Sequence, residues 1–404
     1  MLIRPRLAWI NRIGTQQKFS PGDCMQSLSR EEIVQLIQAV FPKMKTDRKM
    51  AILVDVPNSA ASDTPDWAIR RQIAYEWYQA LQDGLSDLQF DAVFLFAYPS
   101  VDSNNADLPE HAYSLFSPVP KVISDISQTK TTFVEIFSSH QIFLAPTQFS
   151  ATAPLKVNAK KYGFRAATMP GFSPAMIPAL RIDYGLVNQR CQLMKEKLDP
   201  AIAANVRFLV DGADEYHVHF DLRFRSSHAS GGRFPDPGTA GNLPSGETYI
   251  VPYEGERGEK SQTNGTLPVQ FGEQVVLFEI NANRAIGVLS KGSMSEKQAA
   301  YLQREPAYGN MAELGFGILS DFGLEPIGAI LLDEKLAFHI AFGRSDHFDG
   351  VTGPDKFSSP QAVVHIDYIY SAKTQNRISI SSIDLVYPDG EEERIIQKNQ
   401  YMIF

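Results

Sequence analysis

The first half of the chain alternates between short apolar runs and longer stretches in which apolar residues recur every three or four positions. Strands are expected at residues 50–56 and 91–97. Their segments 50–54 and 93–97 are continuously apolar, which is typical of strands buried on both faces of a sheet. Further strands are expected at 141–145 and 163–169, and helices at 30–41, 66–85, 122–138 and 174–198. Ser29 is the expected N-cap of the first helix. Strands that alternate with helices predict a mostly parallel α/β sheet.

The pattern changes near residues 201–206, beyond which strand-like segments dominate. Strands are expected at 207–210, 217–225, 248–252, 274–280, 284–289, 362–370 and 377–386, with one helix at 295–303 capped by Ser295. We therefore predict two domains. Residues 1–205 form an α/β domain, and residues 206–404 form a strand-rich α+β domain.

The length and composition agree with this division and restrict the partners. A chain of 404 residues exceeds one ordinary hydrophobic core. The net charge of −8 argues against a nucleic-acid or anionic-membrane surface, which needs clustered Lys and Arg. We expect neither partner. The first half also lacks the glycine motifs that bind dinucleotides or nucleotide phosphates.

Cysteine usage and hydropathy indicate the compartment. Cys24 and Cys191 are far apart, so a disulfide scaffold and a cysteine-based zinc site are both unsupported. No apolar run reaches the roughly 18 residues of a spanning helix, and the first residues lack the apolar core of a signal peptide. A cytoplasmic protein is expected.

Metal-capable side chains gather between residues 241 and 367, each within an apolar segment punctuated by glycine. They are Glu247, Glu313, His339, His365 and Asp367. Carboxylate oxygens and imidazole nitrogens bind divalent cations, and zinc accepts both. This set exceeds the needs of one tetrahedral ion. Two ions bridged by a carboxylate would use it, and such pairs occur in aminopeptidases.

Each residue also has an alternative interpretation. His365 and Asp367 lie two apart in an alternating strand and share a face, but they also suit a surface His–Asp hydrogen bond. His339 lies in the helix-compatible run 331–343, where a hydrogen-bonded core histidine is the alternative. Glu313 is harder to explain otherwise, because a buried carboxylate needs a cation or many hydrogen bonds. His217 and His219 are interpreted as a strand face.

The segment before Glu247 is rich in glycine, proline and serine. Residues 226–241 are predicted to be either a functional loop or a solvent-exposed linker. With Arg225, this loop is predicted to shape a substrate entrance. The alternative for Arg225 is a surface charge at a strand end.

Several motifs of the second half resemble those of the aminopeptidase T/S family, peptidase family M29. They are Asn-Leu-Pro-Ser-Gly-Glu-Thr-Tyr-Ile-Val-Pro at 242–252, Asn-Gly-Thr at 264–266, the segment around Glu313, His-Ile-Ala-Phe-Gly-Arg-Ser at 339–345 and His-Ile-Asp at 365–367. The resemblance implies that Glu247, Glu313, His339, His365 and Asp367 bind two ions of zinc, cobalt or manganese. It also implies a homodimer.

The chain differs from the family pattern at one ligand of the second ion. The family places a tyrosine ligand seven residues after the histidine matched by His339, whereas this chain has Asp346 there, followed by His347. Either residue is a candidate replacement for the tyrosine.

The 2,5-dihydroxypyridine dioxygenases are similar but bind a single ferrous ion. They have histidine at the position of Glu313 and no acid at that of Glu247. Both acids are present here, which favours the hydrolase pattern. A triad of His339, His365 and Asp367 is nevertheless compatible with non-haem iron.

We therefore expect a metal-dependent hydrolase that releases N-terminal residues from a peptide or another small molecule through a metal-activated water. Glu313 and Glu254 are the candidates for accepting the proton of that water. Two alternatives remain. One is a ring-cleaving dioxygenase with Fe(II), and the other is a catalytically silent relative that binds a ligand.

Overall fold

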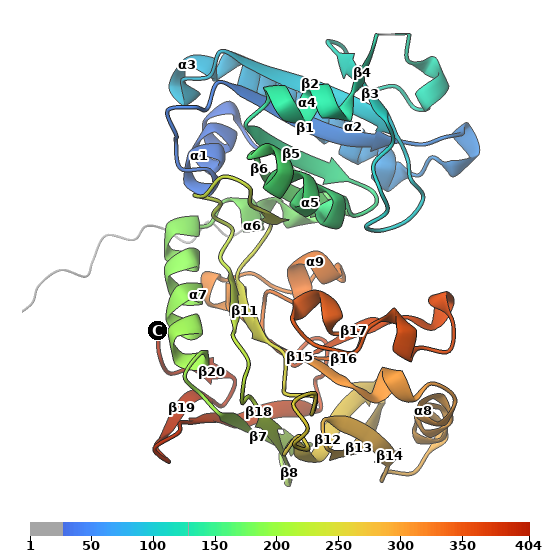
Figure 1. Ribbon diagram of the computed structural model, residues 1–404, viewed down its shortest axis with the longest axis vertical. Helices are drawn as coiled ribbons and strands as arrows, with labels where there is room; N and C mark the ends of the chain where they lie inside the picture. The colour runs from blue at the N-terminus through green and yellow to red at the C-terminus, as the bar shows by residue number, and fades with distance from the viewer. Residues whose placement is uncertain (1–26, 128) are drawn as a thin grey trace, which may run out of the picture.

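The computed structural model describes residues 27–127 and 129–404, so Cys24 lies outside the described residues. The chain forms one body around a seven-stranded sheet and a second body that contains a five-stranded and an eight-stranded sheet (Figure 1). The expected mixture of a parallel α/β sheet and a strand-rich second half is confirmed. Within the described residues, no helix has both the length and the hydrophobicity needed to cross a membrane.

The seven-stranded sheet has the order β10-β6-β5-β1-β2-β3-β4. Its strands are β1 (Lys49–Val56), β2 (Ala92–Pro99), β3 (His111–Leu115), β4 (Lys130–Thr132), β5 (Ile142–Thr147), β6 (Arg165–Pro170) and β10 (Ala240–Asn242). The pairings from β10 to β2 are parallel, whereas β3 and β4 add an antiparallel edge. β1 is buried almost along its whole length, as its continuous apolar run predicts.

The helices of this half are α1 (Arg30–Val40), α2 (Pro65–Asp83), α3 (Leu85–Leu88), α4 (Phe133–Ser139), α5 (Thr152–Tyr162), α6 (Ile177–Leu180) and α7 (Tyr184–Leu198). Ser29 caps α1 within a capping box, as predicted. The helix expected at 122–138 is mostly wrong, because β4 precedes a short α4 that starts at its own cap, Thr132. The helix expected at 174–198 is interrupted, because the Asp183 carboxylate accepts the N–H groups of Gly185 and Leu186 and starts α7.

The eight-stranded sheet of the second half is antiparallel, with the order β14-β13-β12-β8-β7-β18-β19-β20. Its strands are β7 (Ala203–Val210), β8 (Asp214–Asp221), β12 (Asn264–Phe271), β13 (Gln274–Asn281), β14 (Arg284–Val288), β18 (Ile378–Val386), β19 (Glu392–Gln397) and β20 (Gln400–Tyr401). The adjoining helix α8 (Ser293–Arg304) follows Gly292 and has no side-chain cap. The predicted Ser295 cap is wrong, because Ser295 hydrogen-bonds to Ser290 instead.

The five-stranded sheet is also antiparallel, with the order β17-β16-β15-β11-β9. Its strands are β9 (His228–Ser230), β11 (Glu247–Ile250), β15 (Met311–Gly317), β16 (Phe338–Gly343) and β17 (His365–Ile369). Leu314, Phe316 and Ile340 pack into one core with residues of the eight-stranded sheet such as Phe208. Since side chains alternate along a strand, the residues between them face away from that sheet.

Segments from both sides of the predicted boundary at residue 205 pack against the other body. Residues 226–241 contain β9 and then β10, which returns to pair with β6 of the first sheet. α7, which precedes the boundary, packs against β9 and β11. Ile318 and Leu319 join the first body's core, as does Leu331 of α9 (Ile330–Asp333). The division into residues 1–205 and 206–404 therefore stays a prediction.

Candidate metal centre

The five predicted metal ligands lie on four neighbouring strands of the five-stranded sheet. β11 carries Glu247, β15 carries Glu313, β16 carries His339, and β17 carries His365 and Asp367. The helix-compatible interpretation of residues 331–343 is wrong at His339. The short α9 ends at Asp333, and the following segment enters β16, which is hydrogen-bonded to both β15 and β17.

Two overlapping groups have donor atoms close enough to share a metal ion. Glu247, Glu313 and His339 form the first group, here called the Glu247 half-site. Glu313, His365 and Asp367 form the second, here called the His365 half-site. In each group, one donor atom per residue lies within 4.8 Å of the others. Glu313 belongs to both half-sites, so the structure brings together the side chains that the sequence pattern singled out.

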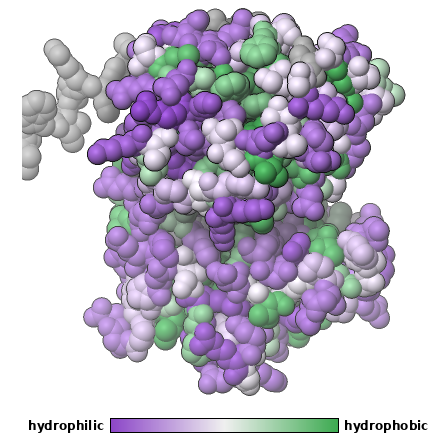
Figure 2. All heavy atoms as spheres, turned by 45° about the horizontal axis from the view of Figure 1, so that its top comes forward, coloured by the Kyte–Doolittle hydropathy of each residue, from purple (hydrophilic) through white to green (hydrophobic). Residues whose placement is uncertain are grey.

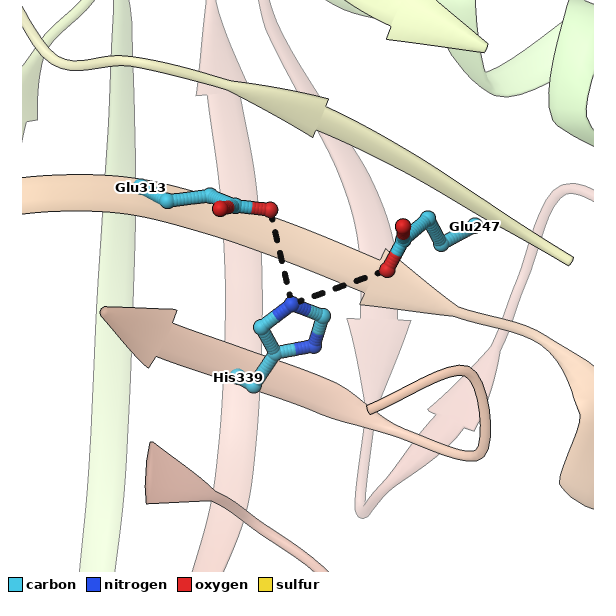
Figure 3. A group of neighbouring side chains, drawn as sticks. All are labelled: Glu247, Glu313 and His339. Atoms are coloured by element: carbon cyan, nitrogen blue, oxygen red, sulfur yellow. Dashed lines mark ion pairs between the residues drawn. The ribbon is translucent and has the colours of Figure 1, made fainter. Parts of the chain in front are cut away.

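The Glu247 half-site is buried, and its imidazole points between two carboxylates (Figure 3). His339 Nε2 lies 3.6 Å from Glu313 Oε1 and 3.8 Å from Glu247 Oε2. Glu247 Oε2 is buried and has no hydrogen-bond partner. A buried carboxylate oxygen without a partner is costly unless a cation or a donor reaches it.

The His365 half-site is more open. His365 Nε2 lies 3.1 Å from Glu313 Oε2 and 3.4 Å from Asp367 Oδ1. The other ring nitrogen, Nδ1, lies 2.7 Å from the carbonyl oxygen of Arg344. A backbone carbonyl that accepts from one nitrogen leaves the other as a ligand, which is the usual arrangement of metal-binding histidines. His339 Nδ1 has a similar partner, the carbonyl of Ala337 at 3.2 Å.

Gly315 makes room for the His339 ring. It lies opposite His339 on β15, and a Cβ atom there would come within 1.9 Å of His339 Nε2. Only a residue without a side chain lets the imidazole cross over the neighbouring strand. The sequence shows that this segment is rich in glycine, but only the fold shows that Gly315 lies against His339.

Lys335 is a charged residue of the centre that sequence reasoning missed. Its Nζ lies 2.5 Å from Glu247 Oε1 and also forms an ion pair with Glu334. The Lys335 side chain is 3% exposed. Its sequence context, Asp-Glu-Lys, is typical of a solvated surface, so no local signal indicated its burial.

Burial and close charges shift the pKa of each group in opposing ways. Burial raises the pKa of Glu313, but hydrogen bonds from His339 and His365 outweigh burial and hold it well below its usual range. Burial lowers the pKa of His339, yet Glu313 and other carboxylates raise it to about 9. The pKa of His365 is raised well above its ordinary value, because Asp367 and Glu313 outweigh burial. Protons thus balance the carboxylate charge of the metal-free centre, and a bound cation would displace them.

The pKa values of Glu247 and Glu334 are raised, whereas that of Glu313 is lowered. Burial raises the pKa of Glu247, although Lys335 and His339 favour its charged form. Burial also raises the pKa of Glu334, to about 8, against the opposing effect of Lys335. The ammonium of Lys335 is therefore the main source of positive charge for both carboxylates.

Asp346 and His347 lie beside the centre but in neither half-site. Asp346 Oδ1 accepts from Arg344 Nε at 2.5 Å. The His347 ring lies 5.1 Å from the His365 ring. Burial, with further effects of His365 and Arg344, lowers the pKa of His347 to about 4. Of the two candidate replacements for the family tyrosine, His347 is thus a neutral ring next to a predicted ligand.

Glu254, predicted as a proton acceptor, is occupied by hydrogen bonds. Its carboxylate accepts from four side chains and one backbone amide, those of Arg225, Asn310, Ser345, Thr352 and Val351. These bonds hold the turn that carries Asp346 and His347. The geometry assigns Glu254 a positioning role, and its catalytic role stays a prediction.

Arg225 is an anchor rather than a surface charge. Its side chain is 7% exposed, and it pairs with Glu254 and Glu256. It also donates to the carbonyl of Asp349 at 2.9 Å. The surface-charge interpretation is therefore wrong. His217 and His219 belong to no metal-binding group among the described residues.

Comparison with known proteins identifies relatives by fold but not by sequence. No family model matches the chain, and a search of curated proteins finds no match. Among solved structures, 2,5-dihydroxypyridine dioxygenase from Pseudomonas putida KT2440 is similar with a TM-score of 0.57 and 14% identity, over 93% of this chain and 98% of that chain. Wild-type AmpT from Thermus thermophilus is similar with a TM-score of 0.52 and 12% identity, over 92% of this chain and 98% of that chain. The resemblance to both groups is confirmed as a likeness of fold along almost the whole chain.

Proposed function

We propose that this chain is a metal-dependent hydrolase of the aminopeptidase type, with one divalent ion in each half-site. The observation that carries the proposal is the position of Glu313. Its two oxygens face different histidines, His339 and His365. A carboxylate between two donor groups could serve two neighbouring ions of a two-metal site.

The donor set fits such ions. The three carboxylates and two imidazoles are ligands that zinc, cobalt and manganese accept, and Glu247 Oε2 is a buried acceptor without a protein partner. When bound, such ions lower the pKa of a coordinated water and polarise a carbonyl group. Homodimerisation and a cytoplasmic location remain part of the proposal.

The chain's own residues supply orientation and proton transfer. The carbonyls of Arg344 and Ala337 hold the two imidazoles so that Nε2 of each faces the carboxylates. Glu313 is the candidate to accept the proton of the attacking water, because its two oxygens face His339 and His365 in the centre. Glu254 holds the turn that carries His347 in place.

The surroundings suit a small organic substrate or the end of a peptide. Aromatic rings extend from His228 through Tyr249 and Phe348 to His365, with centroid distances of 5.2, 4.7 and 5.4 Å. Such a row offers apolar contact to a substrate side chain. Figure 2 shows that the surface is recessed between the upper and lower halves of the molecule, and that polar side chains border this recess.

The dioxygenase alternative has less support from the ligand groups. The fold likeness does not discriminate, because both structural relatives match at similar TM-scores. An iron triad would join His339 with His365 and Asp367. Among the described residues, however, the metal-binding groups join His339 with Glu247 and Glu313 instead.

The test is metal content per chain, measured by elemental analysis on protein stripped of metal and then titrated with zinc, cobalt, manganese or ferrous iron. Two bound ions, with hydrolysis of an aminoacyl reporter rising in step, are expected. One ferrous ion, with oxygen consumption on a dihydroxylated aromatic, would replace the proposal by the dioxygenase. If no ion is bound, the remaining interpretation is a catalytically silent relative that binds a ligand.

A further inference from the structure

A buried ammonium lies against one half-site and not the other. Lys335 Nζ is 2.5 Å from Glu247 Oε1 and also contacts the Glu334 carboxylate. In the part of the chain that the structure describes, the ion pairs of Glu313 and Asp367 involve only histidines. A fixed positive charge therefore belongs to the Glu247 half-site alone.

We propose that Lys335 is a resident cation that competes with the metal ion of the Glu247 half-site. It makes that ion weakly bound and exchangeable, while the ion of the His365 half-site is held tightly. The inference rests on the proposed two-ion function and specifies how the two ions differ. Activity would then follow the supply of free metal.

Charge and coordination both support weaker metal binding in the Glu247 half-site than in the His365 half-site. A like charge within a few ångströms of a divalent ion repels it strongly, since the interior screens charges poorly. Lys335 also occupies one oxygen of Glu247, so only Oε2 faces His339. The Glu247 carboxylate is thus restricted to one oxygen for a metal, and its negative charge is already partly balanced.

The backbone keeps Lys335 in this position. The N–H of Leu319 donates to the Lys335 carbonyl at 2.8 Å. A Cβ atom at Gly317 would come within 2.4 Å of the Lys335 carbonyl carbon, so β15 packs directly against this backbone. Among the described residues, Lys335 forms ion pairs with Glu247 on one side and Glu334 on the other, and these hold the ammonium between two carboxylates.

The experiment is a calorimetric titration of the metal-stripped full chain with zinc, and it requires no catalytic activity. Wild type is expected to show one tight and one weak ion. In K335Q and K335M the Kd of the weak ion should fall by about tenfold or more, because a repelling charge is removed, while the tight ion changes little. K335R, which keeps the charge, should resemble wild type.

Two further variants make the comparison decisive. K373M removes a lysine from an exposed ion pair with Glu325, so it matches the change in net charge and should leave both Kd values unchanged. E334Q/K335Q removes both charges of the Glu334–Lys335 ion pair, and it is the variant to use if the single variants fail to fold. The double variant should also bind the weak ion more tightly than E334Q alone.

Each contrary result has a distinct meaning. A weak-ion Kd that is unchanged or higher in K335Q, K335M and the double variant would overturn the inference and make Lys335 a positioning residue for Glu247. Two equally tight ions in wild type would also overturn it while leaving the hydrolase proposal intact. An absence of zinc binding in every variant would instead contradict the proposed function itself.

Discussion

Glu313 Oε2 lies 3.1 Å from His365 Nε2, although the two residues come from strands that are not direct neighbours in the sheet. β16 lies between β15 and β17, and its residue His339 faces the other oxygen of Glu313. One carboxylate thus connects the two half-sites. Variants of this centre should therefore divide into those that affect one ion and those that affect both.

Removal of single ligands tests this division. H365A and E247A are each expected to lose one ion, whereas E313A is expected to lose both, because only Glu313 is shared. Elemental analysis of the purified variants gives the stoichiometry. The control is H217A, because His217 lies on β8 of the eight-stranded sheet. This variant should keep the wild-type metal content. Unchanged metal content in all three centre variants would refute the ligand assignment.

Gly315→Ala should disrupt the Glu247 half-site without removing any ligand. The new Cβ would meet the His339 ring at 1.9 Å, and overpacking of a buried site costs about 1–3 kcal/mol of stability. We expect a lower melting temperature and loss of the ion at His339. The control is Gly287→Ala, whose Cβ would have its nearest neighbour at 3.7 Å. Equal behaviour of the two variants would contradict this account of Gly315.

His347, rather than Asp346, is expected to take the place of the family's tyrosine. H347A should weaken metal binding by about tenfold, as loss of a ligand or of its supporting group does. D346N should have little effect, because Asp346 is paired with Arg344. Titration of both variants with zinc distinguishes them. A larger effect of D346N would reverse the assignment.

Glu254→Gln should separate positioning from catalysis. The amide keeps the shape of the side chain but removes the charge that accepts from Ser345 and Thr352, at a cost of about 1–3 kcal/mol. We expect a lower melting temperature, retained metal and a reduced kcat that recovers partly at lower temperature. A large loss of kcat at unchanged stability would instead support the predicted role of Glu254 as a proton acceptor.

His140 should make the first body sensitive to acid. Burial lowers its pKa below the ordinary 6.5, and its ring packs against Phe94 and Phe96. Because the unfolded chain binds the proton more readily, the contribution of neutral His140 is fully present above about pH 6.5 and is lost as pH falls through its folded-state pKa. Each unit of pKa shift corresponds to ~1.4 kcal/mol. Melting curves from pH 5 to 8 should show a weaker acid dependence for H140F than for wild type.

Local patterns in the sequence determined the main elements and much of the centre. The apolar run of β1 predicted a buried strand, and Ser29 with Glu32 specified the start of α1. The spacing of His365 and Asp367 placed them on one face, because side chains of a strand alternate. These features depend on neighbouring residues, which the sequence shows directly.

Tertiary structure decided what depends on distant contacts. Residues 331–343 are compatible with a helix in the sequence, but the helix ends at Asp333. Phe338–Gly343 form a strand because β15 and β17 supply hydrogen bonds on both sides. The local sequence around Lys335 is typical of a surface, yet the fold places its ammonium against Glu247. Glu254 likewise accepts from five donors that lie on separate segments. The free energies of burial and of charge pairing belong to the assembled sheet, so no local stretch of sequence records them.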